Sequence, residues 1–514
     1  MADDTPRPGR GPAPDHGPGP QEEHEGSVGP APREAHGGSD ARERAAGSGQ
    51  GSGSGQGAAP GGAADGRDGN DAAKVPELRA SRREGSGRRR RNLPVPVTAT
   101  PIQPAGPETT HHWDARAESV SEIESELARI WGLAAREASL EGMTPSAEAD
   151  AYGDPRFAPR IDQSRDIRVR ARTSVLTLVV VATRPETLER TLDVIAELAG
   201  RHPSRAIILA PGDPDGPPAL DARISLECMV RPASVAETCA ERILMMASGE
   251  TAQHLAGLAT PLLIHDLPVV LWWADDPPLG SRQLRELTET CDQLLIDSGA
   301  FRDDGATRLA ALAVLVSGGQ VAVHDVGWMR LTLWRELLGG LFDHPLLLPE
   351  LPSLRSVRLN VLRPGATLRL SKAALFAGWL ASALDLDVAH PLEPKRNSES
   401  LVGVWTDGHR EIRVEFRPVP SVGQVASVAN GSLQRVELEL GRGRRQIRAR
   451  VSRNADHLLA TADWDGAEVA RRAGRLEPFD EGPYVAESLN KLGHDRIFEE
   501  SVARAARLVS GHAS

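Results

Sequence analysis

The segment from residue 174 to residue 210 constrains the fold most strongly, because it places a helical pattern between two apolar strands. Residues 174–182 are β-branched and almost wholly apolar, and residues 202–210 form a second apolar run. Between them, apolar residues recur at helical spacing until Gly200. The first turn reads as a capping box from Thr183 to Glu186, with a proline inside it. A unit of this length predicts two parallel strands joined by a right-handed crossover.

The same alternation continues along the chain. An amphipathic helix is predicted at residues 120–135. Further strands are predicted at residues 222–230, 269–273 and 293–297, and further helices at residues 235–247, 281–290 and 307–316. Alternating strands and helices predict a doubly wound α/β domain with a mostly parallel sheet, which we place at residues 119–298.

The pattern changes in the second half of the chain. Helices are predicted at residues 328–338, 371–384 and 495–509, and period-two strands at residues 401–405, 411–416, 433–440 and 446–451. Turn residues such as Asp407 and Gly408 separate these strands, which is typical of antiparallel hairpins. We therefore expect an α+β domain at residues 299–514.

Residues 1–118 differ from the rest of the chain, because Gly, Pro, Ala, Ser and charged residues dominate them. With so little apolar surface to bury, this segment is predicted to be a disordered arm. Four arginines at residues 88–91 could touch nucleic acid, acidic lipid or an acidic protein. A solvated tail is the favoured interpretation, since the whole chain carries a net charge of -11. Nucleic acid is thus not an expected partner.

Bulk properties indicate a cytoplasmic protein. No apolar run is long enough to span a membrane, and the first residues do not resemble a signal peptide. The three cysteines, Cys228, Cys239 and Cys291, form no metal-binding spacing and fit a reducing compartment. Cys228 and Cys239 would make a redox switch if they were close in space, but three small buried apolar residues are the favoured interpretation.

Motifs for common chemistries are missing. The first strand-to-helix turn, residues 182–187, lacks the glycine that lets a nucleotide phosphate approach the backbone. The sequence also lacks a Walker A loop, a zinc-binding HExxH motif and a nucleophile elbow. We therefore expect no catalytic residue, no cofactor and no metal site.

Two adjacent tryptophans end the strand at residues 269–273, and two aspartates follow them. Ligands and partners meet α/β sheets at the carboxyl ends of strands, and Trp is enriched at binding hot spots. Trp272, Trp273, Asp275 and Asp276 are therefore predicted to bind a partner. The alternative is that the indoles fill the core on opposite faces and that the aspartates form a turn before Pro277.

Two further groups are weaker candidates. Trp328, Arg330 and Trp334 form a second predicted partner-binding set on a helix. His202 and Arg205 precede a strand and could recognise an anion, although an ordinary helix-to-strand loop explains them equally well.

Several blocks of the sequence resemble the OpcA family, whose members are called glucose-6-phosphate dehydrogenase assembly proteins. The resemblance covers roughly residues 119–510. The blocks lie at residues 201–209, 260–273, 328–338, 375–381 and 492–498, and the second is the most specific.

The resemblance implies a non-catalytic, cytoplasmic assembly factor or allosteric activator. Such a protein would bind glucose-6-phosphate dehydrogenase and promote its active oligomer in the oxidative pentose phosphate pathway. In photosynthetic members this role is linked to cysteine redox state, but no redox cysteine can be matched to this sequence. The alternative hypothesis is a sugar-phosphate-binding module or an enzyme of the same pathway, using His202, Arg205 and the Asp275–Asp276 pair.

Overall fold

The computed structural model describes residues 108–141, 170–172, 174–230, 237–420, 431–476 and 480–512. The predicted arm up to residue 107, with its arginine run, lies outside the described residues. The end of the arm is different, because Glu108–Ala117 forms strand β1, antiparallel to β5 (Ala219–Val230). Predicted disorder is therefore wrong for residues 108–117. This segment has no apolar run to reveal it, and backbone hydrogen bonds to β5 order it.

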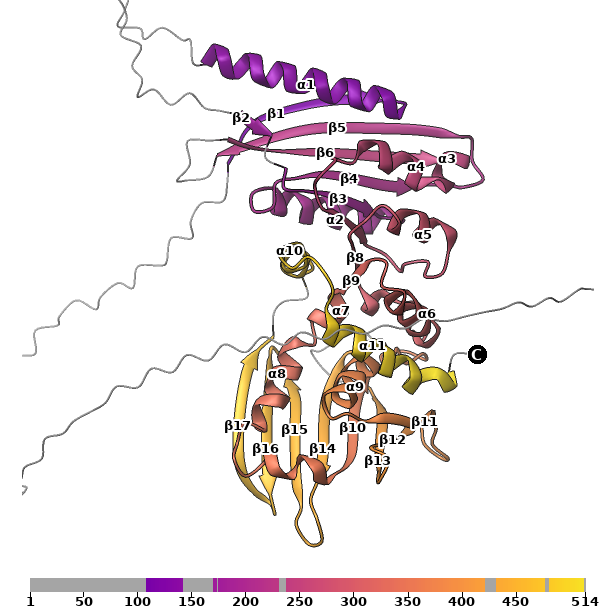
Figure 1. Ribbon diagram of the computed structural model, residues 1–514, viewed down its shortest axis with the longest axis vertical. Helices are drawn as coiled ribbons and strands as arrows, with labels where there is room; N and C mark the ends of the chain where they lie inside the picture. The colour runs from indigo at the N-terminus through magenta and orange to yellow at the C-terminus, as the bar shows by residue number, and fades with distance from the viewer. Residues whose placement is uncertain are drawn as a thin grey trace, which may run out of the picture. The chain divides into compact units, whose positions relative to one another are not determined.

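The first sheet has nine strands in the order β1-β5-β6-β4-β3-β7-β8-β9, with β2 (Arg170–Arg172) paired to β6 (Figure 1). The remaining strands are β3 (Leu176–Val181), β4 (Ser204–Pro211), β6 (Glu237–Ser248), β7 (Val269–Trp273), β8 (Gln293–Ile296) and β9 (Ala322–Asp325). The strands from β6 to β9 in this order run parallel to one another. The mostly parallel sheet predicted from the sequence is confirmed.

Helices cover both faces of this sheet, as a doubly wound fold requires. They are α1 (Val120–Glu141), α2 (Pro185–Ala199), α3 (Glu250–Gln253), α4 (Leu255–Ala259), α5 (Arg282–Thr288), α6 (Ala306–Ser317) and α10 (Gly482–Asn490). Leu178 of β3 lies in one buried cluster with Val194 of α2 and Leu489 of α10. The next residue, Val179, belongs to a second cluster with Ile123 of α1. Strand alternation thus separates two cores.

Strand β6 corrects the helix predicted at residues 235–247. Its residues are mostly good helix formers, such as Glu, Ala, Leu and Met, so the local pattern favours a helix. In the structure, side chains alternate between buried and half-buried from Cys239 to Ala247. The strand lies between β5 and β4 and is hydrogen-bonded to both. Sheet context therefore overrides local propensity.

The second sheet has eight strands in the order β11-β12-β13-β10-β14-β15-β16-β17. They are β10 (Leu354–Leu362), β11 (Asp387–Pro394), β12 (Leu401–Thr406), β13 (Glu411–Val419), β14 (Leu433–Leu440), β15 (Ile447–Asn454), β16 (His457–Trp464) and β17 (Ala467–Arg475). Only β10 and β13 pair in parallel within this sheet. The predicted antiparallel hairpins are confirmed.

Helices pack on one face of the second sheet (Figure 1). They are α8 (Thr332–Leu341), α9 (Ser371–Ala383) and α11 (Arg496–Val509), and the short α7 (Val326–Met329) precedes α8. The single helix predicted at residues 328–338 is thus broken. The carboxylate of Asp325 caps α7 by accepting hydrogen bonds from the N–H groups of Gly327 and Trp328. The predicted boundary after residue 298 stays a prediction, and β9, beyond it, belongs to the first sheet.

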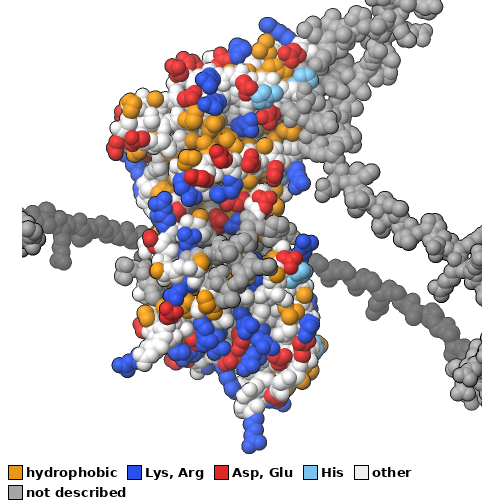
Figure 2. Space-filling model, turned by 180° about the vertical axis from the view of Figure 1, so that it is seen from behind, with side chains coloured by type: hydrophobic (Ala, Val, Ile, Leu, Met, Phe, Trp, Pro, Cys, Tyr) orange, Lys and Arg blue, Asp and Glu red, His pale blue; other side chains and the backbone are white. Residues whose placement is uncertain are grey.

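The opposite face of the second sheet carries charged side chains of both signs (Figure 2). Arg358 lies 3.4 Å from Glu437 and 3.8 Å from Glu415, and Arg448 lies 3.3 Å from Glu437. These ion pairs link neighbouring strands. Opposite charges facing each other across strands favour this register and keep the face polar.

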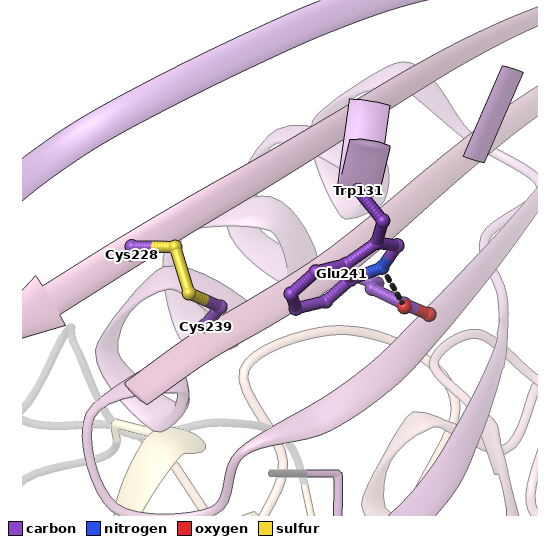
Figure 3. Close-up of a disulfide and its surroundings, with 4 residues drawn as sticks. All are labelled: Trp131, Cys228, Cys239 and Glu241. Carbon is purple, nitrogen blue, oxygen red and sulfur yellow. Dashed lines mark hydrogen bonds between the residues drawn. A yellow bond between two sulfur atoms is a disulfide. The ribbon is translucent and has the colours of Figure 1, made fainter. Parts of the chain in front are cut away.

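A disulfide joins Cys228 of β5 to Cys239 of β6, at directly facing positions of the antiparallel pair (Figure 3). Both residues are fully buried, as the favoured interpretation expected, and they also meet the condition of the alternative, because they lie close in space. Cys291 is a free thiol that donates to the Leu287 carbonyl, and burial raises its pKa to about 12. None of the helices in the described ranges is long and apolar enough to cross a membrane.

Reducing the disulfide is expected to lower the free energy of unfolding by about 2–3 kcal/mol, because the bond closes a loop between residues 11 positions apart. Urea unfolding with and without reductant, and of Cys228→Ser, measures this loss. Cys291→Ala is the control, because it leaves the disulfide in place, and its free energy of unfolding should still fall when reductant is added. Three titratable thiols in the denatured, unreduced chain would contradict the assignment.

Candidate functional site

The parallel strands follow the order of a dinucleotide-binding fold. Numbered along the chain, the strands β6-β4-β3-β7-β8-β9 run 3-2-1-4-5-6. The order reverses between β3 and β7, and α/β folds bind ligands at the carboxyl ends of strands at such a point. The candidate site therefore lies where β3 leads into α2 and where β7 ends.

The carboxylate of Asp275 fills this place. Its Oδ2 accepts hydrogen bonds from the backbone N–H of Thr183 at 2.7 Å and from the Thr183 hydroxyl at 2.8 Å. Its Oδ1 accepts from Arg184 Nε and from the Thr187 hydroxyl, both at 2.7 Å. Burial raises the pKa of Asp275, but the hydrogen bonds from Thr187, Thr183 and Arg184 outweigh burial and hold this pKa below its ordinary value. Asp275 is thus an anion bound by its own chain.

This carboxylate lies beside the start of α2, in the region where nucleotide-binding folds hold phosphate. Helix N-termini bind anions through free N–H groups and the helix dipole. Here Asp275 accepts from the N–H of Thr183, which lies just before α2, and no side-chain cap forms at the start of the helix. The predicted capping box is therefore wrong, because the Thr183 hydroxyl binds Asp275 instead of its own helix. A pyrophosphate at this point would meet a buried negative charge.

A crevice of about 540 Å³ remains beside the carboxyl ends of β3 and β4. Its lining includes Thr183, Gly212 and Arg282. The guanidinium of Arg282 is 2.6 Å from Glu286, one helical turn further along α5. This cation therefore already has an anionic partner.

Asp276, next along the chain, points to a different set of partners. Its Oδ2 lies 3.2 Å from Arg308 and 3.8 Å from Arg302. The side chain is largely buried, and its ion pairs connect the end of β7 with α6. The two adjacent aspartates therefore do not act as a pair.

A second charged group lies at the carboxyl ends of β8 and β9. Asp297 follows β8 and binds Arg330 at 2.5 Å, while Lys372 approaches from α9. Burial raises the pKa of Asp297, but Arg330 and Lys372 outweigh burial and lower it. Asp325, at the end of β9, has its pKa raised to about 6 by burial and by the charge of Asp297. Burial lowers the pKa of Lys372.

Perturbed acids and bases of this kind occur in active sites and also in structural ion networks. Asp325 accepts hydrogen bonds from the backbone N–H and from the hydroxyl of Ser298. The same carboxylate also caps α7. The group thus ties β8, β9 and α9 together. Sequence reasoning missed Asp297 and Lys372. The position of Asp297 at a strand end was a usable signal, whereas Lys372 comes from a distant helix that carries no such signal.

The tryptophan pair lies in the core. Trp272 and Trp273 are each 2 % exposed. Trp272 packs in the cluster that contains Val194, and Trp273 packs in the opposite cluster with Leu284. The alternative that the indoles fill core on opposite faces therefore describes the structure. Partner binding through them stays a prediction, and it requires both indoles to leave the core.

The second predicted set is also mostly buried. Trp328 and Trp334 are each 4 % exposed, and Arg330 is committed to Asp297. Trp328 donates from its indole N–H to Asp495, 3.0 Å away, and lines a cavity of about 460 Å³. The structure brings Trp328 and Arg330 near α10, but it does not bring either to the Asp275 site.

Arg205 is held by an internal ion pair. Its Nε lies 2.5 Å from Glu241 Oε2, and its Nη1 donates to the Leu262 carbonyl at 2.8 Å. The other oxygen of Glu241 accepts from the Trp131 indole at 2.6 Å (Figure 3). His202 is half-buried, and burial together with the charge of Arg201 lowers its pKa. Anion binding by His202 and Arg205 stays a prediction, and a bound anion would compete with Glu241.

Two family models match the chain and together cover more than half of it. The model described as glucose-6-phosphate dehydrogenase subunit N-terminal domain matches residues 195–313, and the corresponding C-terminal domain model matches residues 321–502. The chain belongs to the OpcA family. The resemblance found in the sequence is thereby confirmed.

Curated relatives of this OpcA-family chain come from cyanobacteria. One is the putative OxPP cycle protein OpcA of Nostoc punctiforme, 25% identical over 319 residues, or 61% of this chain and 66% of the relative. Another is the protein of the same name in Synechocystis, 23% identical over 312 residues, or 60% of this chain and 63% of the relative. The chain therefore spans slightly less than two thirds of these relatives.

Solved structures similar to this OpcA-family chain are more distant. One is the WlbA dehydrogenase of Thermus thermophilus in complex with NAD and alpha-ketoglutarate, 13% identical, with a TM-score of 0.36 over 66% of this chain and 95% of that chain. Another is an oxidoreductase of Sinorhizobium meliloti, 10% identical, with a TM-score of 0.33 over 66% of this chain and 90% of that chain. Likenesses at this level carry no functional argument.

Asp275→Asn is expected to lower the free energy of unfolding by about 2–3 kcal/mol, because an amide N–H₂ would face donors of Thr183 or Thr187. The depressed pKa makes the stabilisation by Asp275 fully present above the unfolded-state pKa and lost on acidification through the folded-state pKa. Wild-type stability should therefore fall more steeply than that of the variant below about pH 4. Urea unfolding from pH 2 to pH 7 measures both effects. The control is Asp193→Asn, at an exposed position of α2, and it should change the free energy of unfolding by less than about 0.5 kcal/mol.

Trp272→Ala is expected to lower the free energy of unfolding by about 3–5 kcal/mol, because it leaves a large cavity under α2. Trp272→Phe keeps an aromatic ring and should cost less. Denaturant unfolding of both variants gives the values. A fully stable Trp272→Ala variant would mean that the indole is not part of the core.

Proposed function

We propose that this chain is a non-catalytic factor that binds glucose-6-phosphate dehydrogenase and promotes its active oligomer in the oxidative pentose phosphate pathway. Both family models carry the name of this enzyme in their descriptions, and the cyanobacterial relatives are named OxPP cycle proteins. The proposal adds direct binding and a shift of the enzyme's oligomeric equilibrium.

The non-catalytic part of the proposal rests on the residues at the point where the strand order reverses, between β3 and β7. A dehydrogenase on this strand order needs the start of the first helix free, so that the cofactor pyrophosphate can bind the N–H groups. In this chain Asp275 satisfies the Thr183 N–H and two hydroxyls and is itself paired with Arg184. Displacing this carboxylate would leave it buried without its hydrogen bonds. A carboxylate already held beside the start of α2 supports the non-catalytic part of the proposal.

Activation then follows from linkage. A protein that binds only the active oligomer stabilises that oligomer in proportion to its free concentration over its dissociation constant. At a hundredfold excess over this constant, the shift is about 2.7 kcal/mol, which is close to a hundredfold change in the equilibrium. No chemistry by the chain itself is needed.

The contact residues that we propose are Trp272, Trp273, Asp275, Asp276, Trp328, Arg330 and Trp334. In the free chain the indoles of this set are buried. Contact through them would therefore expose the carboxyl edge of the first sheet, and binding would have to offset the loss of core packing. This condition makes the set testable through the stability of the variants.

The alternative of a sugar-phosphate-binding module is less well supported. Its cations and carboxylates are already satisfied within the chain, because Arg205 binds Glu241 and Asp275 binds Arg184. A sugar phosphate at Arg205 would have to displace a buried carboxylate.

Mixing the full chain with the dehydrogenase of its own organism is expected to raise dehydrogenase activity and to give a shared peak on a size-exclusion column. The mass of that peak, from light scattering, reports the oligomer. Both measurements should be made with the disulfide oxidised and reduced, since reduction changes the chain next to α1.

A matched control separates activation from catalysis. The chain alone should neither oxidise glucose 6-phosphate nor change the fluorescence of NADPH at millimolar cofactor. Absence of both activation and complex in either redox state would overturn the regulator proposal. Cofactor binding by the chain alone would instead overturn the non-catalytic part.

A further inference from the structure

A cavity of about 460 Å³ lies between the start of α8 and the loop that joins α10 to α11. Trp328 and Arg335 line it from one side, and residues 487–498 line it from the other. It is distinct from the Asp275 site. Its volume falls in the range of small-molecule sites, which are mostly apolar with a few placed polar groups.

Arg335 is a cation that its own chain leaves incompletely paired. Its guanidinium carbon lies 3.4 Å from the centroid of the Trp328 ring, and its Nη2 donates to the Thr332 hydroxyl at 2.9 Å. The Nη1 atom is buried and has no hydrogen-bond partner among the described residues. Burial lowers the pKa of Arg335 to about 10, although nearby carboxylates oppose this effect. A buried donor without an acceptor is costly, so the site favours an incoming oxyanion.

Two of the three carboxylates that attract Arg335, Asp495 and Glu487, are engaged elsewhere, and the third is Glu336, the next residue along α8. Asp495 accepts from the Trp328 indole with one oxygen and caps α11 at the Phe498 N–H with the other, both at 3.0 Å. Glu487 pairs with Lys491 at 2.5 Å. The electrostatic attraction of these groups is present, but neither makes a hydrogen bond to Nη1 in the described structure. The charge of Arg335 is therefore only partly matched by the described residues around it.

Two exposed aliphatic side chains line the cavity beside charged ones. Leu492 is 49 % exposed and Ile497 is 60 % exposed, and Lys491, His494 and Arg496 lie in the same lining. Exposed large aliphatic side chains grouped at a cavity mark a binding surface more often than isolated ones do. The site therefore combines apolar side chains with the half-buried cation of Arg335.

The cavity is preformed. His324 of β9 contacts the Gly493 carbonyl through Nε2 at 2.9 Å and the Ser488 hydroxyl through Nδ1 at 3.1 Å. Gln293 of β8 donates to the same hydroxyl at 2.9 Å. Side chains of the parallel sheet thus fix the loop that forms one wall. A fixed wall reduces the entropy that a ligand must lose on binding.

We propose that this cavity binds a small organic anion. Its carboxylate or phosphate oxygen accepts a hydrogen bond from the guanidinium of Arg335, which lines the cavity, and its apolar body packs against Leu492 and Ile497. Trp328 lies against one face of the guanidinium plane and holds it in place. The proposal does not depend on the dehydrogenase, because the chain alone forms the whole cavity.

Calorimetric titration of the full chain with phenyl phosphate, benzoate, inorganic phosphate and benzyl alcohol tests the proposal. At least one of the two aromatic anions should bind at low millimolar concentration or better. Benzyl alcohol, which has the ring without the charge, should bind about tenfold more weakly or not at all. Comparing phenyl phosphate with benzoate identifies the preferred oxyanion, and inorganic phosphate shows how much the apolar body contributes.

Arg335→Met should weaken binding of the preferred anion at least about tenfold. Arg335→Lys keeps the charge but loses the planar fork, and should fall between that variant and the wild type. Arg129→Met, which removes an exposed arginine on α1 that lines neither cavity, is the matched control and should bind as the wild type does. Circular dichroism confirms that each variant is folded.

Two results would overturn the proposal. One is that none of the anions binds at ten times the concentration expected. The other is that folded Arg335→Met and Arg335→Lys bind as tightly as the wild type. Because no dehydrogenase is present in these titrations, their failure leaves the proposed assembly function untouched.

Discussion

The buried carboxylate of Asp275 is the interaction on which the candidate site depends. It joins the end of β7 to the start of α2 across the point where the strand order reverses. The four donors around it make the carboxylate a fixed part of the fold. That position adjoins the region where dinucleotide-binding folds hold phosphate, and the loop at residues 182–187 also lacks their glycine. The proposed assembly role uses the fold as a scaffold.

The other polar groups at this edge follow the same principle of internal pairing. At this edge Asp297 binds Arg330, and at the amino ends of the parallel strands Arg205 binds Glu241, so each of these buried charges has an opposite charge beside it. Breaking such a pair would leave an uncompensated buried charge. The pairs therefore fix the arrangement of these side chains more than they add to the stability of the fold. Arg335 departs from this pattern, since its Nη1 has no acceptor among the described residues. The proposed anion site is thus distinguished by the incomplete pairing of Arg335, more than by the charge of this residue.

Much of the fold could be predicted because hydrophobic periodicity is local. The unit from β3 to β4 could be predicted from its own apolar periodicity, and the hairpins of the second sheet from their period-two pattern and turn residues. The errors have physical causes. β6 is built from helix formers and is a strand only because β5 and β4 lie on either side of it. β1 has no apolar run and is ordered by pairing with β5. Both depend on partners distant in sequence, which no local pattern contains.

The sequence alone determined the class of each domain and the absence of a glycine-rich phosphate loop, because periodicity and spacing encode these directly, and its resemblance to known sequences indicated the family. Tertiary structure decided which polar residues meet. Asp275 was identified from its place after an apolar strand, but its partners Thr183 and Thr187 are about ninety positions away. Arg335 and the loop after α10 are further apart still. Distances between side chains depend on how strands and helices pack, and packing is a property of the whole chain.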